Sequence, residues 1–160
     1  MSEAAREVCV REVAPGDLAA LTRLLGAICA ELGKELPRAE QLAAQLARGA
    51  GPSHLTLVAA EGEQLLAYAQ VHWLPYLLAP TRLDGYLSEL FVHPERRGEG
   101  HGRRLLERIE RELAARGGGR LTLHNDRTRA SYQRAFYAKQ GWTERPEFAR
   151  FAREVPGAGA

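Results

Sequence analysis

The sequence predicts an α/β protein of the α+β type, with a mixed, mostly antiparallel sheet of six to seven strands and about four helices. The apolar patterns follow the order strand, two helices, three strands, helix, strand, helix, and one or two final strands. Two of the middle strands are joined by a short turn at 61–63, which is typical of an antiparallel hairpin. A helix separates the third of them from the next strand, which is typical of a parallel crossover.

The first third of the chain favours one strand and two helices. Residues 8–13 alternate well enough for a strand. The Pro15-Gly16-Asp17 tripeptide opens a helix, for which Gly33 is a typical stop. A second, shorter helix is expected from 37 to 49, after a surface loop. Residues 1–6 are expected to be a disordered tail.

The rest of the chain carries the other strands. Strands are predicted over 54–60, 64–73 and 86–92 and then, after a helix over 102–116, over 121–124, 142–144 and 148–155. The segment 74–84 contains two prolines and is expected to be a loop. A last helix is predicted over 127–140, because aromatic residues recur there at helical spacing. The low-complexity end, 156–160, is expected to be disordered.

A glycine-rich turn follows the central strand and leads directly into a helix. Gly98, Gly100 and Gly102 stand on alternate positions, so a ligand can approach the backbone N–H groups closely. Bare amides at a helix N-terminus, flanked by Arg96 and Arg97, favour an anion and above all a phosphate. The spacing does not match the dinucleotide fingerprint. Gly102 is followed by arginine, whereas the nucleotide-triphosphate loop requires lysine and then Ser or Thr.

What remains is the pattern Arg97-x-x-Gly100-x-Gly102, preceded by Val92-x-Pro94. It resembles the pyrophosphate-binding signature of the GNAT superfamily, the acyl-CoA-dependent N-acyltransferases. The segment FYAKQGW, residues 136–142, is similar to the recurrent Phe-Tyr-x-x-x-Gly-Phe segment of that family. The order of the predicted elements also matches the GNAT fold, and the resemblance covers roughly residues 8–144.

The resemblance implies a sheet splayed at an acyl-CoA site, with acetyl-CoA or another acyl-CoA as co-substrate and no metal. In the family, the strand before the glycine turn holds the pantetheine arm, and the turn with the helix start binds the pyrophosphate. Carried onto this chain, the cofactor-binding residues are Leu90, Phe91 and Val92 for the arm, and Arg97, Gly98, Gly100, Gly102 and Arg103 for the pyrophosphate.

The same resemblance implies an N-acetyltransferase, which moves the acetyl group of acetyl-CoA to a primary amine by direct attack in a ternary complex. The acceptor is expected to be an amine of a small molecule or a peptide. Glu89 is the candidate general base, and Tyr137 the candidate proton donor to the leaving thiolate. Two positions depart from the family pattern. Ser88 stands where many members carry a first acidic residue, and Ala130 where many carry an asparagine.

Each candidate has a structural alternative that the sequence leaves open. Glu89 can be a carboxylate paired with an arginine, Tyr137 a core aromatic residue, and Arg97 a solvated charge. A choice between lining the acceptor site and a local structural role applies to His72, Trp73, Tyr76 and His124. For the whole chain, the alternative is a non-catalytic acyl-CoA-binding module that senses or regulates.

Length and composition narrow the domain count, the partners and the compartment. With 160 residues and no repeat or linker, one acyltransferase domain over 1–160 is expected. The net charge is +2 with acids and bases interleaved, so neither nucleic acid nor a membrane is an expected partner. Two cysteines form no disulfide framework, and neither a signal peptide nor a membrane span is predicted. The expected location is cytoplasmic, and a homodimer is a possible assembly.

Overall fold

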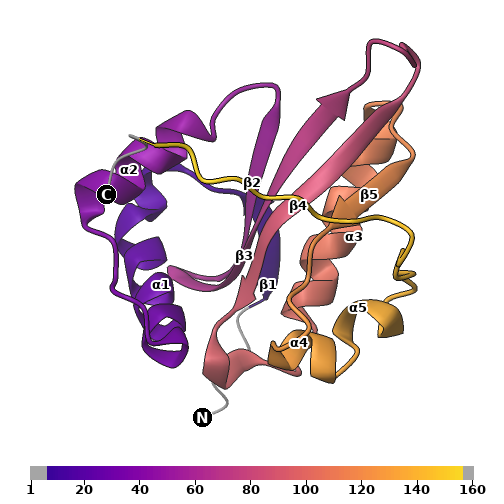
Figure 1. The fold of residues 1–160 in the computed structure, drawn as a ribbon. Coiled ribbons are helices and arrows are strands. Elements are labelled where there is room, and N and C mark those ends of the chain that lie inside the picture. Colours follow the sequence, from indigo (N-terminus) through magenta and orange to yellow (C-terminus); the bar gives the residue numbers. More distant parts are fainter. Residues whose placement is uncertain (1–6, 157–160) are drawn as a thin grey trace. The chain divides into compact units, whose positions relative to one another are not determined.

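A computed structural model describes residues 7–156, which fall into two compact units (Figure 1). The first unit, up to His124, holds the sheet and the three long helices, and the second unit follows it. Of the tails expected to be disordered, residues 1–6 and 157–160 lie outside the described residues. The expectation of a single domain over the whole chain stays a prediction.

The first unit is built on a five-stranded sheet with the strand order β1-β2-β3-β4-β5. Its strands are β1 (Val8–Glu12), β2 (His54–Glu61), β3 (Gln64–Pro75), β4 (Leu83–Val92) and β5 (Arg120–Leu123). The first four strands pair as antiparallel neighbours, whereas β4 and β5 are parallel. The prediction of a mixed, mostly antiparallel sheet is therefore confirmed, and a helix makes the crossover between the two parallel strands.

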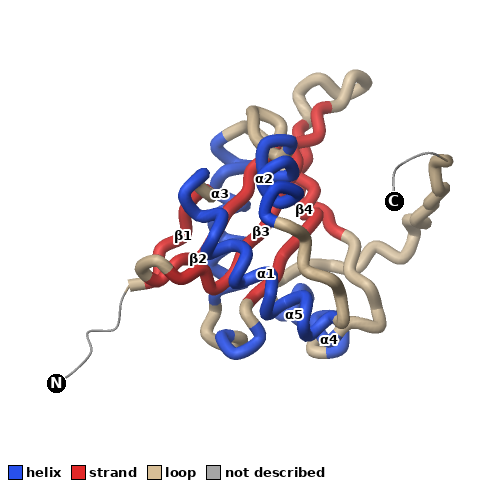
Figure 2. Tube along the Cα trace, turned by 90° about the vertical axis from the view of Figure 1, so that its left-hand side faces the viewer, coloured by secondary structure: helices blue, strands red, loops and turns tan. Residues whose placement is uncertain are grey.

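Three helices cover the two faces of this sheet (Figures 1 and 2). They are α1 (Leu18–Leu32), α2 (Ala39–Arg48) and α3 (His101–Ala115). On one face, α1 packs Leu24 and Ile28 into a cluster with Val58 and Tyr68 of the sheet. On the opposite face, α3 buries the stripe predicted from the sequence, Leu105, Leu106, Ile109 and Leu113. Each such buried side chain stabilises the fold by about 1.5–3 kcal/mol. No helix within 7–156 has the length and apolar character needed to cross a membrane.

The hairpin between β3 and β4 is longer than the sequence predicts. A loop is expected over 74–84, but β3 continues to Pro75 and β4 begins at Leu83. Pro75 pairs with Leu83 at the very end of the ladder. The missing proline N–H costs least at that position, so the two strands can extend past it.

The prediction of six to seven strands is wrong, because no strand follows Leu123 in the described part of the chain. The expected strands over 142–144 and 148–155 are irregular instead. Pro146 lies between them and cannot donate to a ladder. Phe151 is 93% exposed, so this segment lacks the buried apolar face that would stabilise a strand.

The second unit carries two single-turn helices, α4 (Ala130–Gln133) and α5 (Phe136–Lys139), in place of the continuous helix predicted over 127–140. The break lies at Ala135, whose φ of 52° is in the left-handed region. A right-handed helix needs a negative φ at every residue, so it cannot continue through Ala135. This left-handed conformation is uncommon for a residue other than glycine.

Candidate active site

The second half of β4 has one open edge. The ladder between β4 and β5 runs only from Asp84 to Leu87, where β5 ends at Leu123. β4 continues to Val92 and stays paired with β3 along the other edge. Within 7–156, no strand therefore lies beside residues 88–92 on the β5 side. This is the place where the family resemblance implies a splayed sheet.

The register of β4 decides which backbone groups face the open edge. The N–H of His93, just after the strand, donates to Leu66 O of β3 at 2.8 Å. Because backbone groups alternate in direction along an antiparallel strand, the groups of Val92 and Leu90 point away from β3. Phe91 pairs with Tyr68 of β3 instead, and the two rings stack with centroids 5.8 Å apart. Two of the three residues predicted to hold the pantetheine arm thus present their backbone to the open edge.

The glycine turn joins this strand to α3 in a left-handed and uncovered conformation. Gly98 and Gly100 both have φ of 83°, a left-handed value that favours glycine. A Cβ placed on either residue would meet no atom within 4 Å, so packing does not explain why glycine stands here. Open space above the backbone is what a ligand that approaches these amides would require.

The N-terminus of α3 presents free amides to the same space. The first backbone bond of the helix runs from Arg104 N–H to Gly100 O at 3.0 Å. The amides of His101, Gly102 and Arg103 precede it and have no acceptor within the helix. Together with the helix dipole they fit an anionic group such as a pyrophosphate.

The arginines of the turn are already engaged in ion pairs. Arg97 forms a two-pronged pair with Glu31 of α1, both N–O distances being 2.5 Å, and this hydrogen bonding raises the pKa of Arg97. Arg96 contacts Glu61 and Glu99. A phosphate that binds Arg97 would therefore have to compete with Glu31 for the guanidinium.

A β-bulge at Ser88 sets the direction of the two residues at the candidate base position. Gln70 pairs with Glu89 and Val71 with Leu87, so Ser88 is an extra residue in β4. The Ser88 hydroxyl lies 2.8 Å from His72 Nε2 and donates to Gln70 O at 3.2 Å. His72 and Gln70 share one face of β3, so Ser88 and Glu89 both point to that face.

Glu89 lies on this face beside Tyr68, within hydrogen-bonding reach of its hydroxyl. Burial first, and then the charge of Glu89, raise the pKa of Tyr68 far above its ordinary value. Tyr68 therefore stays protonated, while Glu89 itself remains exposed to solvent. An exposed carboxylate on the open half of β4 can attract a cation.

A row of aromatic rings crosses β2 to β5 on the same face. His54 meets His72 edge-on at 4.8 Å between ring centroids, and Tyr86 lies 6.3 Å beyond His72. The Tyr86 hydroxyl lies 3.0 Å from His124 Nδ1, which completes the row. Burial, and then the neighbouring His54, lower the pKa of His72, so its imidazole is neutral at pH 7.

Two other aromatic candidates have structural positions. Trp73 is 5% exposed, and the guanidinium of Arg116 from the end of α3 stacks over its ring at 4.8 Å. Tyr76 donates from its hydroxyl to Asp84 at 3.1 Å. The structure thus favours a local structural role over an acceptor-lining role for both residues.

Tyr137 belongs to the second unit, where its ring contacts Phe136 at 5.0 Å and Trp142 at 5.7 Å. Burial raises the pKa of Tyr137 to about 12. Its hydroxyl therefore keeps its proton at every physiological pH. Ala130 begins α4, and the nearby Asn125 accepts a hydrogen bond from Ser131 at 3.0 Å.

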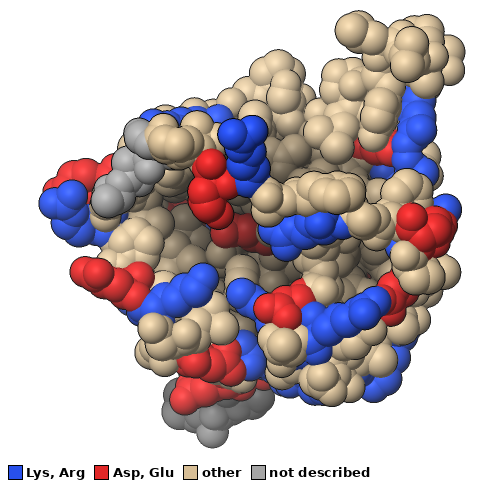
Figure 3. Space-filling model, viewed as in Figure 1, with Lys and Arg blue, Asp and Glu red and all other residues tan. Residues whose placement is uncertain are grey.

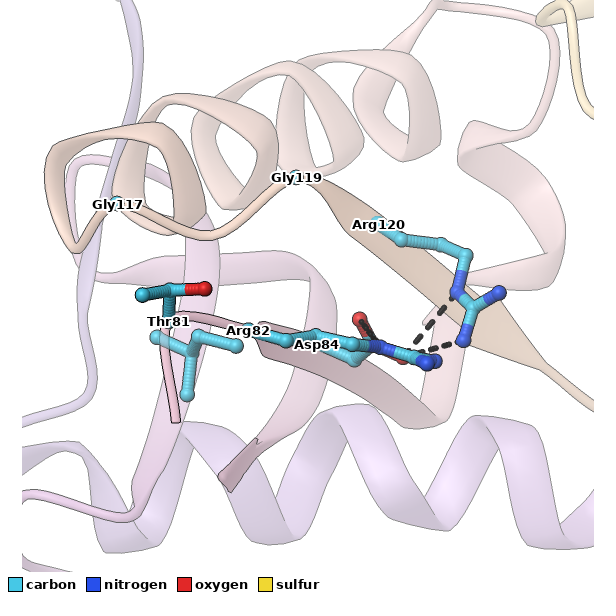
Figure 4. A pocket seen from close by; sticks show the side chains of 7 residues that line it. Thr81, Arg82, Asp84, Gly117, Gly119 and Arg120 are labelled. Carbon is cyan, nitrogen blue, oxygen red and sulfur yellow. Dashed lines mark hydrogen bonds and ion pairs between the residues drawn. The ribbon is translucent and has the colours of Figure 1, made fainter. Parts of the chain in front are cut away.

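A surface cavity of about 470 Å³ lies at the other end of β4, where β4 and β5 begin and α3 ends. Asp84, 2% exposed, accepts from Arg82 and Arg120 there, each at 2.7 Å (Figure 4). The two guanidinium groups neutralise the carboxylate and tie the hairpin to β5. None of the residues predicted to be catalytic or to bind the cofactor lines this cavity. Asp84 is one of four acidic residues, with Glu31, Glu35 and Glu89, that the sequence offers as possible attractors of a cationic amine, and here it is engaged by two arginines.

The charged surface matches the sequence expectation. Figure 3 shows basic and acidic side chains interleaved over the viewed face, with no large area of one sign. Many of them form ion pairs, such as Arg108 with Glu112 at 2.8 Å. A face of this kind exerts no strong long-range attraction on a polyanion.

Most of the chain matches the profile of one protein family, described as the Acetyltransferase (GNAT) family, over residues 20–142. The chain belongs to this family. The match includes the open half of β4, the glycine turn, α3 and the segment around Tyr137. The resemblance read from the two sequence motifs is therefore confirmed, and acyl transfer is the activity of the GNAT acetyltransferases as a family.

Curated relatives are acetyltransferases. Mycothiol acetyltransferase of Kineococcus radiotolerans is 34% identical to the chain over 146 residues, which cover 89% of this chain and 44% of that protein. IAA acetyltransferase of Azospirillum brasilense is 42% identical over 67 residues, or 42% of this chain and 43% of that protein. The chain spans less than half the length of these relatives.

Solved structures share the GNAT fold. A putative acetyltransferase from Agrobacterium tumefaciens str. C58 has a TM-score of 0.77 at 21% identity, over 91% of this chain and 99% of that one. An aminoglycoside acetyltransferase from an uncultured soil metagenomic sample, in complex with sisomicin, has a TM-score of 0.74 at 16% identity, over 92% and 96%. At these identities the likeness supports the fold alone.

Proposed function

We propose that the protein transfers an acetyl group from acetyl-CoA to a primary amine by direct attack in a ternary complex. The observation that carries this proposal is the open edge of β4 between Ser88 and Val92, which leads directly into the uncovered glycine turn and α3. Acetyl-CoA joins an extended pantetheine arm to an anionic pyrophosphate, and these two parts fit the open strand edge and the free amides that follow it.

The cofactor would be bound mainly by the backbone. Leu90 and Val92 offer N–H and C=O groups to the pantetheine arm, while Phe91 supports the strand through its stacking on Tyr68. The pyrophosphate would accept from the amides of Gly98, Gly100, Gly102 and Arg103, with Arg97 exchanging Glu31 for phosphate. When bound, acetyl-CoA supplies the thioester that reacts.

The acceptor amine must lose a proton before it can attack. An alkyl ammonium has a pKa near 10.4, so its deprotonation at pH 7 costs about 4 to 5 kcal/mol. Glu89 is the proposed base, acting directly or through water, and its exposed carboxylate would also attract the ammonium group. The carbonyl oxygen would gain negative charge during the attack, and a backbone N–H at the open edge, near Val92, would stabilise it.

The thiolate must leave with a proton. Tyr137 is the proposed donor. Burial raises its pKa to about 12, so its hydroxyl carries a proton at neutral pH. The free thiol has a pKa near 8.5, so it is a stronger acid than this phenol. Donation from Tyr137 is therefore expected to contribute modestly to the rate.

The acceptor is a small molecule or a peptide that carries a primary amine. Support for a small molecule comes from a curated relative, which is named mycothiol acetyltransferase. The carboxylate of Glu89 on an exposed face supports a cationic acceptor.

The test is release of the CoA thiol from acetyl-CoA in the presence of a panel of amines, comprising aminoglycosides, amino sugars, polyamines and short peptides. We expect thiol release that depends on at least one amine, with a matching acetylated product. Tight acetyl-CoA binding without thiol release on any amine would favour the second candidate, a non-catalytic acyl-CoA-binding module. The departures at Ser88 and Ala130 from the family pattern are what support that candidate.

A further inference from the structure

The Ser88–His72 pair is a second proton-accepting group beside Glu89. Ser88 Oγ lies 2.8 Å from His72 Nε2, and Gln70 O lies 3.2 Å from the same hydroxyl. The bulge in β4 directs Ser88 and Glu89 to one face of the sheet, on the half of β4 whose other edge is open. A hydroxyl that is exposed to solvent and backed by an imidazole can pass a proton from a ligand to the ring.

Acylation of an ammonium group requires two proton acceptors. The first proton leaves before attack, to free the lone pair. The second leaves the nitrogen after attack, when it carries a positive charge in the tetrahedral intermediate. One carboxylate can hold only one of these protons until it releases it to solvent. A second acceptor nearby would remove the need for that release within the turnover.

We propose that Ser88 and His72 form a proton relay that takes the second proton from the acceptor nitrogen, while Glu89 takes the first. This inference rests on the proposed function. In the relay, the Ser88 hydroxyl turns from Gln70 O to the unprotonated Nε2 of the His72 tautomer that carries its proton on Nδ1. The nitrogen then gives its proton to Ser88 Oγ as the hydroxyl proton of Ser88 moves to His72 Nε2. The C–S bond breaks and the thiolate takes the proton of Tyr137. Of the two protons that left the nitrogen, one restores Tyr137 by way of solvent and the other is released, so the products are the amide, free CoA and one proton.

The surroundings suit a neutral imidazole that gains a charge only transiently. The titratable groups that face His72 are His54 of β2 and Tyr86 and Glu89 of β4. His124 of β5 lies beyond Tyr86. Burial and His54 lower the pKa of His72, so the ring is ready to accept at pH 7 and becomes protonated in the resting enzyme only in acid. The relay should therefore fail as the pH falls through the lowered pKa of His72.

The first test measures kcat and KM against pH, with an amine that the wild-type protein acetylates. His72→Gln and Ser88→Ala should each lower kcat at pH 7 by about 10²-fold with little change in KM for the amine, and His72→Gln should move the acid limb of the profile to lower pH, where only Glu89 titrates. Ser88→Thr keeps a hydroxyl and should retain most of the rate. A purely structural role for the pair would leave the acid limb in place.

His54→Gln is the matched histidine control. It should keep the rate at high pH but move the acid limb to higher pH, because the neighbour that lowers the pKa of His72 is gone. Unchanged kcat and pH profile in His72→Gln would overturn the relay. An acetyl group on Ser88, found by mass spectrometry of the quenched reaction, would also overturn it, since Ser88 would then be a nucleophile.

A second test needs no turnover. NMR titration of the imidazole signals in the free protein should show the His72 signals altered by Ser88→Ala and the His124 signals unaltered. Unaltered His72 signals would overturn the contact on which the relay rests. The two failures are distinguishable. If the contact is present but the wild-type protein acetylates no amine, the proposed function fails and the relay fails with it. If the protein acetylates an amine but the contact is absent, only the relay fails.

Discussion

Ser88 shows how one residue changes the chemistry of a face. In a regular strand, Ser88 and Glu89 would point to opposite faces of the sheet. The bulge places both on the same face, with His72 behind the hydroxyl at 2.8 Å. No local pattern in the sequence marks a bulge at this point, because it depends on the pairing with β3. The sequence could therefore predict Glu89 as a candidate but not the pair beside it.

Tyr137 is the second residue for which the chemistry can be tested singly. We expect Tyr137→Phe to leave acetyl-CoA affinity intact and to lower kcat by about tenfold, below the usual range for an acid catalyst, because the thiol is the stronger acid. Steady-state kinetics with calorimetric binding would check this. Full activity in the Phe variant would show that water or another group supplies the proton.

At the scale of the element, the sequence predicts the structures that neighbouring residues determine, but not those that depend on contacts between distant parts of the chain. The glycine turn and α3 follow from nearby residues, namely three glycines and an apolar stripe at helical spacing. The absence of the final strands and the break at Ala135 depend on tertiary packing. Residue 135 is an alanine, so no glycine or proline marks the break in the sequence. The backbone sites at Leu90 and Val92 likewise depend on where β5 ends.

The glycine turn gives a matched pair of variants. Gly100 and Gly117 both have a left-handed φ, 83° and 74°, and a Cβ on either meets nothing within 4 Å. Alanine should thus cost each the same backbone strain, about 1 kcal/mol. Only at Gly100 would the new methyl group stand where the pyrophosphate is proposed to bind. We expect Gly100→Ala to weaken acetyl-CoA binding at least tenfold and Gly117→Ala to leave it unchanged, as measured by calorimetry. Equal affinities in the two variants would contradict the assignment.

At the scale of the whole molecule, the buried carboxylate of the first unit lies away from the proposed site. Asp84 is almost fully buried and accepts from Arg82, Arg120 and Tyr76 at the end of β4 remote from the glycine turn. This cluster joins the β3–β4 hairpin to β5, and it leaves the exposed carboxylate of Glu89 at the open half. Stability and chemistry therefore rest on different carboxylates.

We expect Asp84→Asn to lower the free energy of unfolding by about 2 kcal/mol, because a buried, charge-assisted hydrogen-bond cluster is weakened. Glu107→Gln, which removes the exposed pair with Arg103, should change it by less than about 0.5 kcal/mol. Denaturant unfolding of both variants checks the contrast, and equal effects would show that the Asp84 cluster is not a stabilising element.

The most direct test of the account is calorimetric titration of the folded protein with acetyl-CoA. The account predicts one site of micromolar or tighter affinity, weakened by Gly100→Ala. No binding of acetyl-CoA, in a protein shown to be folded by its circular dichroism, would contradict the claim that the open edge of β4 and the glycine turn form an acetyl-CoA site.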